Sequence, residues 1–274
     1  MTQPPITSLT NARVKAAVRL RDRRERETTG LTIVDGAREI LRAIDAGARV
    51  DSAFVAPDLL RSPDALAAAD RLRGRPTTFE VSPAVLAKVA FGDRSDGIVA
   101  IVKTPTLGLD VLGRHLPPDP LVVVVEGVEK PGNLGAVLRS ADGAGAAAVI
   151  AADPLTDPFN PNAIRASLGT IFALPVVSAT SDEIIDWLVD RGIRPVAAIV
   201  DSAIPYTDAD LTGPVAIVLG SEAGGLSGRW RDRSVTAVSI RMAGVADSLN
   251  VSIAAAVLLY EAVRQRSVTA ERRD

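Results

Sequence analysis

Residues 121–125 form an unbroken apolar run of one leucine and four valines. A strand with one face in water alternates apolar and polar residues, whereas a strand covered on both faces reads as a continuous β-branched run. The run therefore predicts a buried strand of a parallel sheet. Because strand-like and helix-like segments alternate after it, the sequence predicts an α/β fold with helices layered on that sheet.

The second part of the chain contains further strands and helices in alternation. The expected strands after the first run are 147–151, 196–200, 215–219 and 235–240. The expected helices are 134–144, 163–169, 182–191 and 249–264. The last helix is apolar almost all round from residue 251 to 259. It is therefore expected to be buried in the core or in a dimer interface.

Residues 1–103 have the pattern of a smaller α/β unit. Its expected helices are 11–26, 37–46, 65–72 and 83–89, and its expected strands are 31–34, 53–56, 77–81 and 97–102. Residues 104–120 contain four prolines, two of them adjacent, which is typical of a linker. The sequence thus predicts a small domain at 1–103, a linker at 104–120 and a second domain at 121–274.

The residue types present exclude several kinds of chemistry. The 274 residues include no cysteine and one histidine, His115, within the proline-rich stretch. Disulfides, thiolate nucleophiles and cysteine-based or multi-histidine metal sites are therefore excluded, and no metal is expected. No apolar run approaches a membrane span, and residues 1–15 lack a signal-peptide pattern. We expect a cytoplasmic protein with no membrane partner.

The first of three polar loops follows the strand at 121–125. It contains Asn133 between Gly132 and Gly135, and Arg139 follows four residues after Gly135 on the same face of the expected helix. Helical side chains lean toward the N-terminus, so Arg139 is expected to point back at the loop. An arginine there suits a phosphate or carboxylate, although a surface ion pair explains it about equally well.

The other two loops also follow expected strands. The second, 220–226, places Glu222 among three glycines, which a plain strand-to-helix turn would also explain. The third, 240–247, is rich in small residues and leads to Ser248 and Asn250, which predict a helix N-cap. The glycine patterns of phosphate-binding P-loops and of dinucleotide-binding folds are both absent.

Residues 11–27 contain seven basic and three acidic residues, although the net charge of the chain is −2. Phosphate contacts come from local basic patches and not from overall charge, so this segment is a candidate for contacts with nucleic-acid phosphates. The alternative is a solvated helix face with ion pairs between successive turns.

Taken together, the three loops resemble the three signature motifs of a known family. The stretches 133–139, 220–226 and 240–252 are similar to the motifs of the SpoU (SPOUT-class) RNA 2′-O-ribose methyltransferases. Two further stretches, 8–15 and 165–175, agree with the same family, so the resemblance covers essentially the whole chain. The family usually has proline where this chain has Arg241.

The resemblance implies a fold, a reaction and partners. It implies an N-terminal RNA-binding domain and a C-terminal catalytic domain with a deep trefoil knot, which no periodicity in the sequence would predict. It also implies a homodimer formed through the C-terminal domain. S-adenosylmethionine is the implied cofactor, and the implied reaction is methylation of a ribose 2′-hydroxyl in ribosomal or transfer RNA.

The resemblance assigns roles to residues as well. The implied catalytic set is Asn133, Arg139, Glu222, Ser248 and Asn250. The implied cofactor-binding set is Leu219, Gly220, Ile240, Met242 and Leu249. The expected RNA contacts are Arg13, Lys15, Arg19, Arg23, Arg165 and Ser167.

Arg139 has the hardest role to explain chemically. Because a guanidinium stays protonated in proteins, we expect it to clamp the phosphate beside the target ribose and stabilise the developing alkoxide. Asn133 and Asn250 are expected to orient the hydroxyl, and Glu222 to hold the arginine or shape the pocket.

The expected substrate is 23S ribosomal RNA, because an N-terminal domain of this type accompanies that substrate class. A transfer RNA methyltransferase and a non-catalytic RNA-binding protein of the same fold stay open as alternatives. A nicotinamide-dependent enzyme is disfavoured by the missing glycine patterns.

Overall fold

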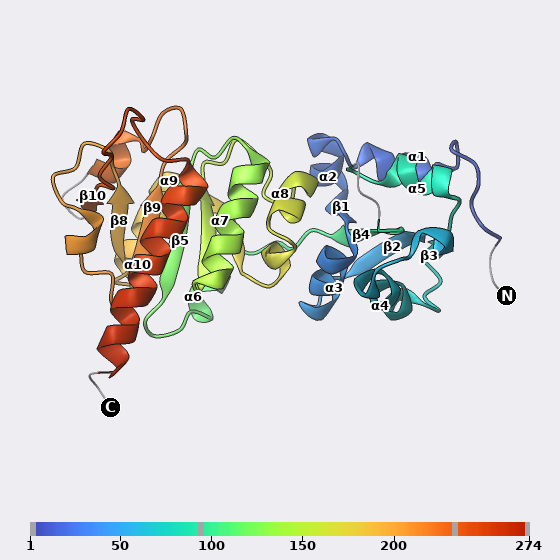
Figure 1. Cartoon of the computed structure of the whole chain (residues 1–274), viewed down its shortest axis with the longest axis horizontal. Coiled ribbons are helices and arrows are strands. Elements are labelled where there is room, and N and C mark those ends of the chain that lie inside the picture. Colours follow the sequence, from blue (N-terminus) through green and yellow to red (C-terminus); the bar gives the residue numbers. More distant parts are fainter. Residues whose placement is uncertain (1–3, 93–95, 232–234, 272–274) are drawn as a thin grey trace. The chain divides into compact units, whose positions relative to one another are not determined.

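The computed structural model describes residues 4–92, 96–231 and 235–271. It divides into two compact units, each visible in Figure 1. The first unit comprises residues 1–105 and 159–173, and the second comprises residues 106–158 and 174–274. Residues 159–173, which the sequence placed in the second domain, thus pack with the first unit.

The first unit is built on a four-stranded sheet with the strand order β1-β4-β2-β3. Its strands are β1 (Leu31–Asp35), β2 (Val50–Val55), β3 (Thr78–Glu80) and β4 (Ile98–Lys103). β4 runs antiparallel to β1 and to β2, and β3 runs parallel to β2.

Helices cover both faces of this sheet (Figure 1). On one face, α1 (Ala12–Arg19) and α5 (Pro83–Val89) enclose a core that includes Phe54, Phe79 and Ile101. On the other face lie α3 (Ala37–Asp45) and α4 (Pro63–Leu72), with η1 (Pro57–Leu59) preceding α4. α8 (Pro161–Ala166) and η2 (Thr170–Phe172), from the inserted segment, contact β1 and α3 respectively.

The prediction of one helix over residues 11–26 is wrong. α1 ends at Arg19, and a separate helix, α2, spans Arg23–Thr29. The physical reason lies at the junction, where the Asp22 side chain accepts a hydrogen bond from the Arg24 amide and caps the second helix. Buried Arg26 donates from its guanidinium to the carbonyls of Leu20 and Arg21, which fixes the break.

The second unit contains a six-stranded sheet in which every pairing is parallel, which confirms the predicted class of fold. The strand order is β10-β8-β9-β5-β6-β7. The strands are β5 (Leu121–Glu126), β6 (Ala148–Ala152), β7 (Val176–Ala179), β8 (Arg194–Ala198), β9 (Val215–Leu219) and β10 (Thr236–Val238). The central strand β5 is the valine run, and all its residues are buried.

Two layers of helices cover this sheet. α7 (Pro131–Gly143) and α10 (Val251–Glu271) lie side by side on one face (Figure 1). The other face packs against α9 (Ser181–Asp190), α6 (Leu109–Arg114) and η4 (Gly228–Arg231), and η3 (Tyr206–Asp208) lies in a connection. α6 falls within the stretch predicted as a linker, and it forms because Leu112 packs into the core.

No helix among the described residues is long and apolar enough to cross a membrane. The trefoil knot implied by the family resemblance stays a prediction.

Candidate active site

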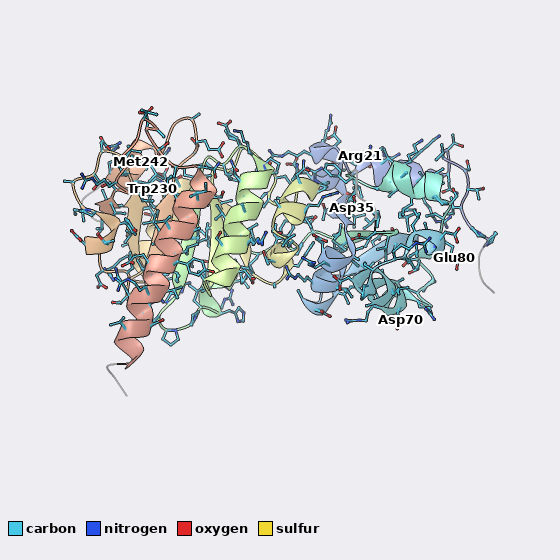
Figure 2. All side chains as sticks on the ribbon, in the orientation of Figure 1. Arg21, Asp35, Asp70, Glu80, Trp230 and Met242 are labelled. Carbon is cyan, nitrogen blue, oxygen red and sulfur yellow. The ribbon has the colours of Figure 1, made fainter. Side chains whose placement is uncertain are left out.

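A cavity of about 280 Å³ opens where β8, β9 and β10 end, at the carboxyl edge of the parallel sheet. This edge is where open α/β sheets bind their ligands. The wall also includes the first turn of α10. The residues predicted to bind a cofactor all line it: Leu219, Gly220, Ile240, Met242 and Leu249. Met242 is labelled in Figure 2.

The loop 220–226 is folded tightly against itself. Ser221 and Gly225 exchange two backbone hydrogen bonds of 3.1 and 3.0 Å. A Cβ atom on Gly220 would overlap the backbone of Gly225, so only glycine fits there. Gly225 itself has a φ of +63°, which strongly favours glycine. The glycines predicted from the sequence thus shape the loop that forms one wall of the cavity.

The first and third loops meet at the start of two helices. The Asn250 side chain caps α10 by accepting hydrogen bonds from the Ser252 amide at 2.9 Å and hydroxyl at 2.7 Å. Its amide nitrogen lies 3.4 Å from the side-chain oxygen of Asn133, in the first turn of α7. Two members of the predicted catalytic set are therefore adjacent.

Glu222 lines the cavity and forms an ion pair with Lys130, whose Nζ lies 3.1 Å from its carboxylate. Lys130 is the N-cap residue of α7, so this pair joins the first loop to the second. Glu222 was expected to hold the arginine or to shape the pocket; it lines the cavity, and its ion pair is with Lys130. Lys130 was overlooked, although it stands in the same glycine-containing loop.

Arg139 lies on α7, is exposed, and is not among the residues that line the cavity. Its guanidinium makes no hydrogen bond or ion pair with any residue that the structure describes. It is therefore available to an anionic ligand.

Glu126 is a residue of the candidate site that the sequence did not predict. It is buried at the carboxyl end of β5 and accepts hydrogen bonds from the Ser181 hydroxyl, the Ser227 amide and the Ser227 hydroxyl, at 2.7 to 2.8 Å. Burial raises the pKa of Glu126, but the hydrogen bonds from Ser227 and Ser181 outweigh it and lower the pKa below its ordinary value. Because Ser227 directly follows loop 220–226, Glu126 anchors the wall of the cavity.

The charge of the cavity wall is one-sided. Glu222 and Asp247 contribute carboxylates, Ser248 contributes a hydroxyl, and no lysine or arginine lines the cavity among the described residues. The wall therefore favours a ligand with positive charge, even though Lys130 partly offsets Glu222.

The cations predicted to contact RNA lie in the first unit. Arg13, Lys15, Arg19 and Arg23 are exposed on α1 and α2. Arg19 pairs with Glu25 at 3.0 Å and Arg23 with Glu27 at 2.7 Å. These two pairs agree with the alternative interpretation of this segment, a solvated helix face with ion pairs. Arg13 and Lys15 carry no carboxylate partner among the described residues.

The other two predicted RNA contacts have structural partners instead. Arg165 forms an ion pair of 3.2 Å with buried Asp35 of β1, which is labelled in Figure 2. Burial raises the pKa of Asp35, against the lowering effect of the Phe91 and Gly92 amides and of Arg165. Ser167 is fully buried and its hydroxyl donates to the Ile164 carbonyl at 2.8 Å. The position of Ser167 does not support an RNA contact.

The second unit is an α/β domain with a parallel sheet. It has a negatively charged cavity at the carboxyl edge of that sheet, between a tight glycine loop and a capped helix, which is typical of a ligand-binding α/β enzyme. The family model of the SpoU rRNA methylases matches residues 120–260. A second model, the MRM3-like substrate binding domain, matches residues 11–100. The chain belongs to the SpoU rRNA methylase family.

Known relatives are similar over most of the chain. A 23S rRNA (uridine(2479)-2′-O)-methyltransferase from Streptomyces viridochromogenes is 33% identical over 84% of this chain and 71% of its own length. The 23S rRNA (guanosine-2′-O-)-methyltransferase RlmB from Ralstonia nicotianae is 39% identical over 66% of this chain and 74% of its own length.

Solved structures are similar as well. The SpoU methyltransferase AviRb from Streptomyces viridochromogenes, in complex with AdoMet, has a TM-score of 0.82 and 33% identity, over 93% of this chain and 98% of its own. An AdoMet-bound rRNA methyltransferase from Sinorhizobium meliloti has a TM-score of 0.85 and 29% identity, over 95% of this chain and 97% of its own.

Proposed function

We propose that this protein uses S-adenosylmethionine to methylate a ribose 2′-hydroxyl of RNA, and that its substrate is 23S ribosomal RNA. The observation that carries the proposal is the cavity at the carboxyl edge of the second unit, with carboxylates and no basic side chain in its described wall. The named relatives support the substrate, but one is named for uridine and another for guanosine. The proposal therefore concerns the ribose and not the base.

The cavity suits S-adenosylmethionine on grounds of charge. This molecule has two positive groups, a sulfonium and an ammonium, and one carboxylate, so its net charge is positive. The Glu222 and Asp247 carboxylates in the cavity wall therefore attract it. A dinucleotide carries negative phosphates and would be repelled. Leu219, Gly220, Ile240, Met242 and Leu249 would hold the cofactor. When bound, the cofactor supplies an already activated methyl group.

The polar residues of the chain then have to position the ribose. Arg139, free of described protein partners, clamps the phosphate beside the target ribose and stabilises negative charge as it develops on the 2′-oxygen. Asn133 and Asn250, whose side chains lie 3.4 Å apart, orient the hydroxyl. Ser248 and Glu222 line the cavity and fix its shape and charge.

The first unit supplies affinity for the RNA. Arg13, Lys15, Arg19 and Arg23 present cations from α1 and α2 to phosphates, and the domain model matching residues 11–100 is one of substrate binding. We further propose that the protein acts in the cytoplasm as a homodimer that pairs through α10.

Transfer of a radiolabelled methyl group tests the function. Purified wild type, Arg139→Ala and Arg139→Lys are incubated with labelled S-adenosylmethionine and unmethylated total RNA, which is then separated by size. Label in the 23S class with the wild type and not with Arg139→Ala supports the proposal. Because lysine cannot form a bidentate contact with phosphate, Arg139→Lys should lose about tenfold to a hundredfold in turnover.

The other outcomes decide among the alternatives. Label confined to transfer RNA would replace the proposed substrate. Absence of label from every RNA, despite measurable cofactor binding, would favour a non-catalytic RNA-binding protein. Near-full turnover by Arg139→Lys would refute the proposed clamp.

A further inference from the structure

A second cavity, of about 390 Å³, lies in the first unit between α1 and the sheet. Its floor is apolar and includes Phe54, Phe79 and Ile101, and Ala16 of α1 forms part of its side. The two phenylalanine rings lie 6.0 Å apart between centroids. The cavity therefore offers an apolar, partly aromatic surface on the same face as the proposed RNA-contacting helix.

Arg13 stands at the rim of this cavity in an unusual setting. Its guanidinium carbon lies 4.6 Å from the centroid of the Phe79 ring, and it has no carboxylate partner among the described residues. Arg13 is exposed to solvent and also lines the cavity. Guanidinium planes and aromatic rings are the surfaces on which unpaired RNA bases stack.

Asp51 stands at the same rim because the strand is irregular. Neighbouring residues of a strand normally face opposite sides of the sheet. A register shift between Val50 and Ser52 interrupts the pairing of β2 with β4, and as a result both Asp51 and Ser52 line the cavity. Bulges of this kind re-aim side chains. The Asp51 carboxylate has no hydrogen bond or ion pair with any described residue.

We propose that this cavity receives one unpaired nucleobase of the RNA substrate. The base stacks on Arg13 above Phe79, and the Asp51 carboxylate accepts hydrogen bonds from N–H groups on the base edge. Lys15, on the same helix, contacts a flanking phosphate, while the ion pair between Arg19 and Glu25 forms part of the cavity wall. A paired base cannot enter, since its N–H edge is occupied by its partner. The inference rests on the proposed function for the identity of the ligand as RNA.

Filling the cavity is the first test, and the full-length protein is used throughout. Binding of a fluorescein-labelled, mixed-sequence single-stranded RNA 12-mer is compared with binding of the same strand in a perfect duplex. Ala16→Trp should weaken single-strand binding about tenfold and leave duplex binding unchanged, because base stacking is lost. Ala67→Trp is the matched control, since Ala67 is exposed on α4, on the other face of the sheet.

Removing the Asp51 carboxylate should change the RNA affinity in opposite directions under the two hypotheses. On a surface that binds RNA by charge alone, Asp51→Ala removes a repulsive charge and strengthens binding. In a base receptor the same change removes a hydrogen-bond acceptor, so it should weaken single-strand binding severalfold. Asp58→Ala, at an exposed position outside the cavity, controls for net charge.

The proposal is overturned if Ala16→Trp leaves the affinity for single-stranded RNA unchanged, or if it lowers the affinities for single strand and duplex equally. An unchanged affinity for the single strand would point to a protein as the ligand of this cavity. If Ala16→Trp fails to fold, as judged by circular dichroism, the sign of the Asp51→Ala effect decides. The methylation assay separates the two proposals. If the wild type methylates RNA and Ala16→Trp does so with the same KM for RNA, the proposed base-binding site is wrong and the proposed function stands. If the wild type does not methylate RNA, the proposed function is wrong.

Discussion

Glu126 links three segments around the candidate active site through one buried side chain. Its carboxylate takes hydrogen bonds from Ser227 and Ser181, and so connects the end of the central strand to the segment after loop 220–226 and to α9. A buried carboxylate is costly unless it is fully hydrogen-bonded. The loop that walls the cofactor cavity is therefore held in place by a charged group beneath it.

Replacing Glu126 by glutamine should weaken the fold in a pH-dependent way. The hydrogen bonds lower the pKa of Glu126 below its ordinary value in spite of its burial. Its carboxylate therefore stabilises the fold above the ordinary pKa of a glutamate, and this contribution is lost as pH falls through the lowered pKa. Glu126→Gln should reduce the free energy of unfolding by about 2 kcal/mol at neutral pH. The deficit should shrink in acid.

Urea denaturation at neutral and acidic pH measures this, with cofactor affinity measured in parallel at neutral pH. Glu129→Gln is the control, because Glu129 is exposed in the segment that follows β5. A deficit in Glu126→Gln that is the same at both pH values would contradict the role assigned to the carboxylate.

Arg165 could contact RNA, or it could stabilise the fold through its ion pair with Asp35. If it serves the fold, Arg165→Ala should cost about 2 kcal/mol of unfolding free energy, because Asp35 is left buried with less compensation. Burial raises the pKa of Asp35, so its ionised form opposes folding as pH rises through that raised pKa. The cost should therefore be largest at neutral pH and smaller in acid.

The comparison is with Arg38→Ala, which removes an exposed ion pair with Asp64 and should change stability by less than about 0.5 kcal/mol. Chemical denaturation and RNA titration of both variants decide the matter. Weaker RNA binding by Arg165→Ala without loss of stability would show that the RNA role is the correct one.

At the scale of elements, α1 is the segment on which RNA affinity should depend. Lys15 is exposed and has no ion-pair partner among the described residues. Lys15→Ala should therefore weaken binding to all RNA sequences about equally. The slope of log affinity against log salt should decrease in magnitude by about 0.7 to 1. A salt titration of RNA binding measures that slope.

Arg73→Ala serves as the control, because Arg73 follows α4 on the other face of the sheet and pairs with Asp70. An equal change of slope in both variants would mean that α1 is not the RNA-contacting surface.

Several elements could be predicted because their sequence patterns are unambiguous. The valine run gave β5, and the helix expected at 83–89 matches α5. β7 was missed because it is only four residues long and contains Ser178. The break between α1 and α2 was missed because Asp22 looked like one more charge in a basic run, when it is a cap.

The site could be predicted in part for the same kind of reason. Glycine, asparagine and arginine at fixed spacing identify the loops, and the structure brings Asn133 to Asn250 and lines the cavity with the residues expected there. Glu126 could not be found, because a sequence does not distinguish a buried carboxylate from an exposed one at a strand end. Neither could the Asp35–Arg165 pair, which joins residues 130 positions apart.

At the scale of the whole molecule, the exposed apolar face of α10 bears on the oligomeric state. Ile253 is 52% exposed and Tyr260 is 54% exposed, and they are seven residues apart and thus on one side of the helix. Light scattering should give a mass of twice 28.6 kDa for the wild type, and Ile253→Asp should give monomers.

Val189→Asp, at an exposed apolar position on α9, should leave the dimer intact. A monomeric wild type, or a dimer that survives Ile253→Asp, would contradict pairing through α10.

The most direct measurement of the central claim is alkaline hydrolysis of RNA labelled by the wild-type protein. Alkali cleaves RNA through attack by the 2′-hydroxyl on the adjacent phosphate, so a 2′-O-methyl group protects its linkage. The account predicts that the label is recovered in alkali-resistant dinucleotides and is absent when Arg139→Ala replaces the wild type. Label recovered in mononucleotides would mean methylation of a base, and would contradict the account.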